Sequence, residues 1–244
     1  SPITISADDR PPLTLSVVVD TSGSMAAAGK LDFVRQGLHR LVNAMHDDDE
    51  LALIAYNSTV DVLYETGSVA NRRNELADLI DSLEPTGATN LYAGLEAGFQ
   101  ELQSVVTADR QYRLLLLSDG EPTIGVVDPQ AIVDMSAGYN TQGLGLTTVG
   151  LGTDFNYDLM RDLADQADGN FYFVENAGAV DEVFDEELSY FTVPIAFDLH
   201  LEVVSGSDYT FGRAYGSHLL EDTPDGGRLD VPSIFLAHRD SDDD

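Results

Sequence analysis

The sequence predicts an α/β fold in which a doubly wound, mostly parallel β-sheet is flanked by helices. Two observations lead to this prediction. Residues 13–19 and 112–119 are near-continuous apolar runs, which are typical of parallel strands buried on both faces. Along the rest of the first 190 residues, apolar runs alternate with amphipathic stretches. Such alternation favours a parallel sheet covered by helices.

The predicted elements follow one another in a regular order. Residues 31–45 carry apolar side chains at helical spacing, so a helix follows the first strand. The runs 51–57 and 60–66, joined by Asn-Ser-Thr, predict a hairpin. The remaining predicted helices are 73–83, 90–106, 128–137, 156–167 and 178–190, and the remaining predicted strands of this region are 144–152 and 169–174.

The pattern changes after Phe191, where apolar and polar residues alternate with period 2 and no helical spacing is found. A β segment of about 50 residues is too short to form a stable sandwich alone, so we expect the strand-like residues 1–10 to complete it. The predicted organisation is an α/β domain over 11–190 and a small β module from 1–10 and 191–244. The strand-like runs of the second part are 197–206, 209–217 and 226–236.

The chain is strongly acidic, with 43 acidic residues, 12 basic residues and a net charge of −31. A field of this sign repels phosphate backbones, which excludes nucleic acid as a partner. Two explanations of the charge stay open: a solvated surface suited to high salt, and an acidic docking face. We interpret the run His46–Glu50 as a solvated turn after a helix.

Cysteine is absent, which excludes a disulfide framework and thiolate metal sites. The chain contains no run of about 18 apolar residues, so no membrane span is predicted in it. It also shows no signal-peptide pattern. The chain begins with Ser1 and ends in Asp-Ser-Asp-Asp-Asp, so it could be a mature or trimmed piece. An extracellular, cell-surface or periplasmic location is favoured over the cytoplasm, and the compartment stays open.

Polar side chains follow the first apolar strand, with Asp20, Ser22 and Ser24 at alternate positions. A phosphate-binding loop does not fit, because Leu31 stands where that motif needs a hydroxyl residue. Neither serine lies in the G-x-S-x-G pattern of a nucleophile elbow. A phosphoaspartate site of the D-x-D-x-T type would need a second aspartate in place of Ser22.

A metal site explains these residues better. Asp20 and Asp119 both end apolar strands, and ligands of parallel sheets bind at the carboxyl ends of the strands. Carboxylate and hydroxyl oxygens are hard ligands that suit Mg²⁺. The alternative use of Asp20 and Ser22 is helix capping, which does not explain a second strand-ending aspartate. The run 154–158 imitates a calcium loop, but Leu159 stands where that loop requires glycine.

Three segments together resemble the motifs of a von Willebrand factor type A domain with an intact metal-ion-dependent adhesion site. They are "VVVDTSGSM" (17–25), "TGATNLYAGL" (86–95) and "LLLLSDGEPTIG" (114–125), and the likeness covers residues 11–190. The resemblance is to the bacterial and inter-alpha-trypsin-inhibitor heavy-chain branch. It implies that Asp20, Ser22, Ser24, Thr89 and Asp119 hold the metal, with Thr86 as the rival of Thr89.

The resemblance also implies a function. Such a domain binds a protein ligand whose Asp or Glu side chain completes the coordination of Mg²⁺, with Mn²⁺ or Ca²⁺ as alternatives. We therefore expect an interaction or adhesion module and not an enzyme. Glu121 and Thr123 are expected to shape the rim of the site. The alternatives are a subunit that acts with an ATPase and, less favoured, a metal-assisted hydrolase.

Overall fold

The computed structural model describes residues 11–107, 110–119, 121–152, 155–166, 169–174, 194–206, 220–223 and 226–235. The chain divides into two compact units, Ser1–Thr192 and Val193–Asp244, and each is described by itself. The helix predicted at 178–190 and the strands predicted within 1–10 and 209–217 lie outside the described residues. The domain boundaries drawn from the sequence therefore stay a prediction.

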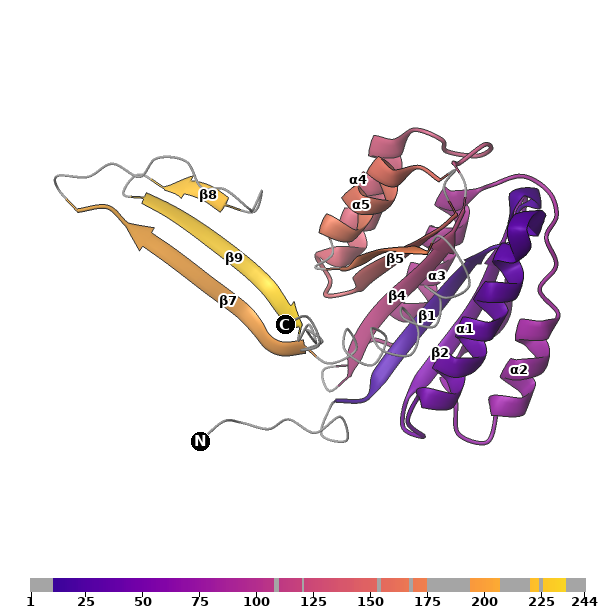
Figure 1. The fold of residues 1–244 in the computed structure, drawn as a ribbon. Helices are drawn as coiled ribbons and strands as arrows, with labels where there is room; N and C mark the ends of the chain where they lie inside the picture. The colour runs from indigo at the N-terminus through magenta and orange to yellow at the C-terminus, as the bar shows by residue number, and fades with distance from the viewer. Residues whose placement is uncertain are drawn as a thin grey trace, which may run out of the picture. The chain divides into compact units, whose positions relative to one another are not determined.

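A six-stranded sheet forms the centre of the first unit (Figure 1). Its strand order is β3-β2-β1-β4-β5-β6, and every neighbouring pair is parallel except the β2–β3 hairpin. This arrangement confirms the predicted doubly wound, mostly parallel sheet. The strands are β1 (Leu13–Asp20), β2 (Glu50–Tyr56), β3 (Val60–Ser68), β4 (Gln111–Ser118), β5 (Gly145–Leu151) and β6 (Phe171–Val174).

Helices cover the sheet, with α1 and α2 on one face and α3, α4 and α5 contributing to a shared core on the other (Figure 1). A short 3₁₀ helix, η2 (Gly23–Gly29), precedes α1 and was not predicted. No described helix has the length and apolar character needed to cross a membrane. The α-helices are α1 (Lys30–Ala44), α2 (Arg73–Asp81), α3 (Leu91–Gln103), α4 (Pro129–Asn140) and α5 (Tyr157–Gln166).

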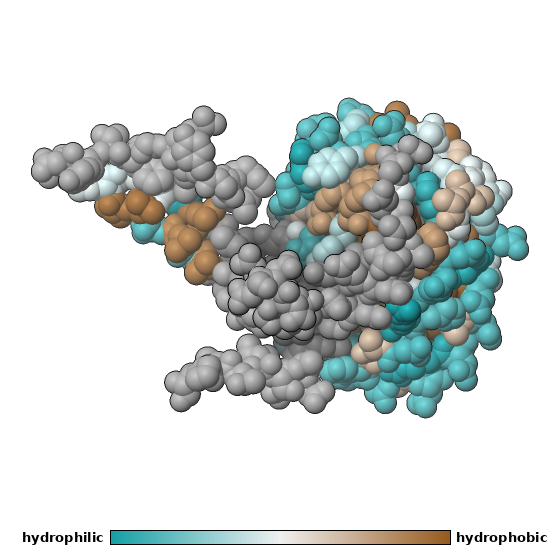
Figure 2. All heavy atoms as spheres, viewed as in Figure 1, coloured by the Kyte–Doolittle hydropathy of each residue, from teal (hydrophilic) through white to brown (hydrophobic). Residues whose placement is uncertain are grey.

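Hydrophilic residues cover much of the described surface of this unit, as the acidic composition requires (Figure 2). The acidic run His46–Glu50 is not simply a solvated turn, and that interpretation is wrong for Asp49. Asp49 is fully buried, and its two carboxylate oxygens accept hydrogen bonds from the backbone amides of Leu13 (2.9 Å) and His46 (2.8 Å). The buried carboxylate of Asp49 therefore joins the start of β1 to the turn before β2, and it satisfies one backbone amide in each.

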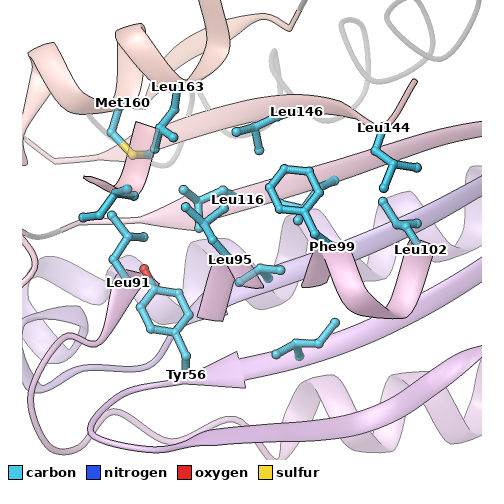
Figure 3. Close-up of a cluster of buried hydrophobic side chains, with 14 of the residues drawn as sticks. Tyr56, Leu91, Leu95, Phe99, Leu102, Leu116, Leu144, Leu146, Met160 and Leu163 are labelled. Carbon is cyan, nitrogen blue, oxygen red and sulfur yellow. The ribbon is translucent and has the colours of Figure 1, made fainter. Parts of the chain in front are cut away.

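The main core lies between α3 and the sheet, where Leu95, Phe99 and Leu102 face the strands (Figure 3). Phe99 stacks on Tyr139 of α4 with ring centroids 4.7 Å apart. The helix approaches the sheet closely because it presents glycine at position 98. A Cβ atom there would lie 2.4 Å from Val18 Cγ2, far inside van der Waals contact. The position of α3 relative to β1 therefore depends on this glycine.

The described part of the second unit is an antiparallel sheet of order β7-β9-β8, in agreement with the predicted β segment. Its strands are β7 (Pro194–Val204), β8 (Leu220–Thr223) and β9 (Gly226–Phe235). Sequence reasoning missed β8, because Leu-Glu-Asp-Thr contains no apolar alternation. Leu201, Val203 and Val204 of β7 are 48%, 48% and 66% exposed, and apolar atoms are visible on this unit in Figure 2.

Candidate metal centre

Four of the five predicted site residues come together at the carboxyl ends of β1 and β4. The Ser22 and Ser24 hydroxyl oxygens are 3.0 Å apart, and the Ser24 hydroxyl donates a 2.7 Å hydrogen bond to Asp119 Oδ1. The Ser22 backbone amide donates to Asp20 Oδ1 at 2.8 Å. Two carboxylates and two hydroxyls from loops 95 residues apart in sequence thus form one chain of contacts.

Asp20 is the last residue of β1, and polar residues end the neighbouring strands β2 and β4 beside it. Tyr56 pairs with Asp20 in the register of β1 and β2. Asp20 Oδ2 accepts hydrogen bonds from the Ser118 hydroxyl (2.8 Å) and the Tyr56 hydroxyl (3.3 Å). The Tyr56 hydroxyl also lies 3.0 Å from Ser118 Oγ. Sequence reasoning missed Tyr56 and Ser118. The sequence does contain a signal for them, because each is a polar residue that ends an apolar strand.

Burial dominates the electrostatics of Asp20. The side chain is fully buried, and desolvation raises its pKa above the usual value. Hydrogen bonds from Ser22 and Ser118 oppose this shift, and the negative charge of Asp119 adds to it. Burial, followed by the charge of Asp20, also raises the pKa of Tyr56 well above its usual value, which keeps this hydroxyl protonated as a donor. A cation near Asp20 would relieve the electrostatic penalty of burying its charge.

Helix capping does not account for the Ser22 hydroxyl. Ser22 is the N-cap residue of η2, yet its side chain makes no capping hydrogen bond. Its hydroxyl instead contacts Ser24 Oγ. Ser22 is 2% exposed, whereas Ser24 is exposed, so the pair extends from the buried Asp20 toward solvent.

The loop before α3 contributes Thr89 and lies against the first loop through its backbone. The Gly23 amide donates to the Gly87 carbonyl at 3.1 Å, and Gly87 has a φ of +76°, which favours glycine. Thr89 is 4% exposed, and its amide donates to the Thr123 hydroxyl at 2.9 Å. Among these described residues, no hydrogen bond joins the Thr89 hydroxyl to the other four side chains. Thr86, the rival, has an exposed side chain.

The β4–α4 loop supplies the rim residues in different ways. The Thr123 hydroxyl supports the Thr89 backbone, and the Thr123 amide returns a 2.9 Å hydrogen bond to the Thr89 carbonyl. Glu121 is exposed.

In the run that imitates a calcium loop, Asn156 Oδ1 accepts a hydrogen bond from the Leu159 amide at 3.1 Å, which is a helix-capping contact.

Lys30 is a further member of this cluster that sequence reasoning did not place there. Its ammonium nitrogen lies 2.6 Å from Asp119 Oδ2, and its side chain is 12% exposed. Asp119 therefore directs one oxygen to Ser24 and the other to Lys30.

The chemistry of the donor set fits a hard divalent cation. Hydroxyl and carboxylate oxygens are the ligands that Mg²⁺ prefers, and two buried carboxylates outnumber the single lysine charge. Within the described ranges, no group of three or more His, Cys, Asp or Glu side chains is placed to hold a metal. A metal here would depend on the hydroxyls of Ser22 and Ser24 as well as on the two aspartates.

The sheet topology and the loop cluster at its carboxyl edge define a doubly wound α/β domain with a candidate site for an oxygen-coordinated ion. The family model of the von Willebrand factor type A domain matches residues 15–186, and the chain belongs to this family. Domains of this family are protein-interaction and adhesion modules.

Bacterial and animal proteins are similar in sequence to this chain. The chain is 27% identical over 198 residues to the Escherichia coli (strain K12) protein YfbK, covering 81% of this chain and 34% of YfbK. It is 24% identical over 169 residues to the mouse (Mus musculus) inter-alpha-trypsin inhibitor heavy chain H2, covering 66% of this chain and 18% of the heavy chain. The chain thus spans only a minor part of these relatives.

Solved structures share the fold. A von Willebrand factor type A protein from Catenulispora acidiphila has a TM-score of 0.72 at 16% identity, covering 92% of this chain and 55% of that one. Proximal thread matrix protein 1 from the mussel byssus, solved with a zinc-occupied metal-ion-dependent adhesion site, has a TM-score of 0.62 at 17% identity, covering 74% of this chain and 46% of that one.

Proposed function

We propose that the chain is a divalent-metal-dependent protein-interaction module. In this proposal a partner protein presents an Asp or Glu side chain that binds the metal ion. The proposed metal-holding residues are Asp20, Ser22, Ser24, Thr89 and Asp119. The observation that supports it most is the convergence of two buried aspartates with the Ser22–Ser24 hydroxyl pair at one edge of the sheet.

The donor set suggests why such a site would bind a partner. Neutral hydroxyl ligands leave a divalent ion electrophilic, so the ion supplies an attractive centre for an incoming carboxylate oxygen. Mg²⁺ fits these hard oxygen donors, with Mn²⁺ or Ca²⁺ as alternatives. The zinc-occupied site of the mussel protein supports metal binding in this fold, and says nothing of which ion this chain takes.

Binding is favoured over catalysis by the neighbours of the two aspartates. The described groups that contact them are hydroxyls, a backbone amide and the Lys30 ammonium. None of these is a histidine, the side chain that most often acts as a general base.

The charge of the chain constrains the partner. An acidic ligand must approach a protein of net charge −31, which repels it at long range. We therefore expect the carboxylate of the partner to be surrounded by Arg or Lys side chains. Such a rim would steer association, while the carboxylate would provide the metal-dependent contact.

The test is capture of a partner by the immobilised protein with Mg²⁺ and with a chelator. Capture is expected to need Mg²⁺ and to fall about tenfold or more in Thr89→Ala, because loss of a group that holds or orients a metal weakens the site. Thr86→Ala is the matched control, since Thr86 lies in the same loop with an exposed side chain, and it is expected to leave capture unchanged.

Capture that survives both the chelator and Thr89→Ala would contradict the proposal. Recognition would then lie on another face of the chain or in the second unit. The identity of a captured partner would also separate adhesion from the alternative role beside an ATPase.

A further inference from the structure

Lys30 is notable at the candidate site because it places a positively charged side chain where a cation is proposed to bind. The Lys30 ammonium and Asp119 Oδ2 are 2.6 Å apart, with the two side chains 12% and 0% exposed. Because both side chains are largely buried, solvent screens the interaction between their charges only weakly.

The rest of the fold holds the lysine in place. Gly29 has a φ of +71° and turns the chain into α1, so that Lys30 becomes the first residue of the helix. The stem of Lys30 passes Gly152 at the end of β5, where a Cβ atom would lie 2.7 Å from Lys30 Cε. The turn at Gly29 and the chain at Gly152 therefore both shape the position of the ammonium beside Asp119.

The residue type is also specific. Lys30 is the single lysine of the chain, and the other 11 of its 12 basic residues are arginines. An ammonium is a compact point charge, whereas a guanidinium is a wide, planar fork that pairs with both oxygens of a carboxylate. Lysine thus neutralises one oxygen of Asp119 and leaves the other to the Ser24 hydroxyl.

Charge counting gives the consequence. Asp20 and Asp119 carry two negative charges and Lys30 one positive charge, so the three groups sum to −1. A divalent ion would bring this sum to +1 with Lys30, and to zero without it. A positive site attracts a carboxylate ligand, but the same lysine repels the metal ion and competes with it for Asp119.

Resting on the proposed function, we infer that Lys30 is a built-in cation that sets the charge of the metal site. It weakens divalent-ion binding, stabilises Asp119 when no metal is bound, and favours an anionic ligand on the loaded site. Lys30 is a positioning and specificity-determining residue, and it is not itself proposed as a metal ligand.

The test compares the wild type with Lys30→Met, which keeps the length of the side chain and removes its charge. Chelator-treated full chains are titrated with Mn²⁺ by calorimetry. Lys30→Met is expected to bind Mn²⁺ about tenfold more tightly, because repulsion between the lysine and the ion is gone. Lys30→Arg keeps the charge, and because its guanidinium can pair with both oxygens of Asp119, it is expected to bind Mn²⁺ no more tightly than the wild type. Equal or weaker Mn²⁺ binding by Lys30→Met, or an equal gain in Lys30→Arg, overturns the inference.

A second readout follows thermal unfolding. In chelator, Lys30→Met is expected to unfold at a lower temperature than the wild type, because Asp119 is left buried without its counter-charge. Saturating Mn²⁺ is expected to remove that difference, and a difference that persists unchanged in Mn²⁺ contradicts the role in the site. If Lys30→Met does not fold in chelator, Lys30→Gln, which still donates a hydrogen bond, takes its place with the same expected sign.

The preference for an anionic ligand is measured with acetate as the probe. Acetate that displaces water from protein-bound Mn²⁺ lowers the enhancement of water-proton relaxation. Lys30→Met is expected to need about tenfold more acetate than the wild type for the same effect. Equal acetate dependence removes this part of the inference.

The outcomes also separate this inference from the proposed function. If neither the wild type nor Lys30→Met binds Mn²⁺, the inference about Lys30 and the proposed function both fail. If Lys30→Met alone binds Mn²⁺, the effect of Lys30 is upheld, and metal dependence of the natural chain is refuted. If both bind Mn²⁺ equally well, the metal site stands and the role of Lys30 falls.

Discussion

Asp20→Asn is expected to weaken Mg²⁺ or Mn²⁺ binding about tenfold or more and, in chelator, to make the protein more stable than the wild type. Asparagine keeps an oxygen for the Ser22 amide and can donate to the Ser118 hydroxyl in place of accepting from it. What disappears is the buried negative charge. Weaker metal binding together with higher stability is the result expected when a residue serves function at the expense of stability.

The pH dependence follows from the raised pKa of Asp20. Burial is the main cause, so the folded protein holds this proton to higher pH than the unfolded chain does. The favourable contribution of Asp20 is present below the unfolded value, near 3.8, and is lost as pH rises through the raised folded value. In chelator, the advantage of Asp20→Asn should therefore be largest near neutral pH and shrink as the solution is acidified.

Thermal unfolding in chelator between pH 4 and pH 8 measures this advantage, and each 1 kcal/mol corresponds to about 2–4 °C for a chain of this size. Ser118→Ala is a useful comparison, because it leaves the Asp20 charge buried with one donor fewer and is expected to lower stability. Unchanged metal affinity in Asp20→Asn would contradict the assignment of Asp20. A lower stability of Asp20→Asn at every pH would show that the charged carboxylate is stabilised by its neighbours.

Most of the first unit was predictable because its signals are local. The buried strand predicted at 13–19 is β1 (Leu13–Asp20), and the helix predicted at 31–45 is α1 (Lys30–Ala44). The 3₁₀ helix η2 was missed because its glycine and serine residues indicate a turn, and its short run of alanines carries no helical apolar spacing. Short elements of this kind depend on neighbouring loops, here on the contact between Gly23 and Gly87.

The candidate site was predictable only in part, for a related reason. Asp20, Ser22 and Ser24 stand together in sequence, and Asp119 follows a recognisable strand. Tyr56 ends an apolar strand without any motif, and its place beside Asp20 follows from the β1–β2 register, which the sequence does not specify. Lys30 was visible as the only lysine, but its contact with Asp119 depends on how η2 and α1 turn.

Gly98→Ala is expected to destabilise the protein by about 1–3 kcal/mol, although alanine is the better helix former. The added Cβ would meet Val18 Cγ2 at 2.4 Å and Leu114 Cδ1 at 2.8 Å, in a part of the core where both neighbours are fully buried. Since close-packed interiors have no free volume to absorb a methyl group, α3 must move away from the sheet. Chemical denaturation of the chelator-treated protein measures the loss.

Gly138→Ala is the matched control, because Gly138 lies in α4 and a Cβ atom there meets nothing within 4 Å. The same substitution is expected to raise stability at this position, by at most about 1 kcal/mol, through helix propensity alone. Equal effects at both glycines would contradict the close approach of α3 to β1.

The displacement of α3 has a consequence for the site. Thr89 stands two residues before Leu91, where α3 begins, and Asn90 caps the helix through the Ala93 amide. Moving the helix therefore moves the threonine loop relative to Asp20 and Ser22, which belong to β1 and its following loop. Gly98→Ala is expected to weaken Mn²⁺ binding several-fold in molecules that remain folded, whereas Gly138→Ala leaves it unchanged, because misplacing a ligand loop weakens a metal site even without loss of a ligand. Undiminished Mn²⁺ affinity in a clearly destabilised Gly98→Ala protein would show that Thr89 is positioned by its contacts with Thr123, independently of the helix.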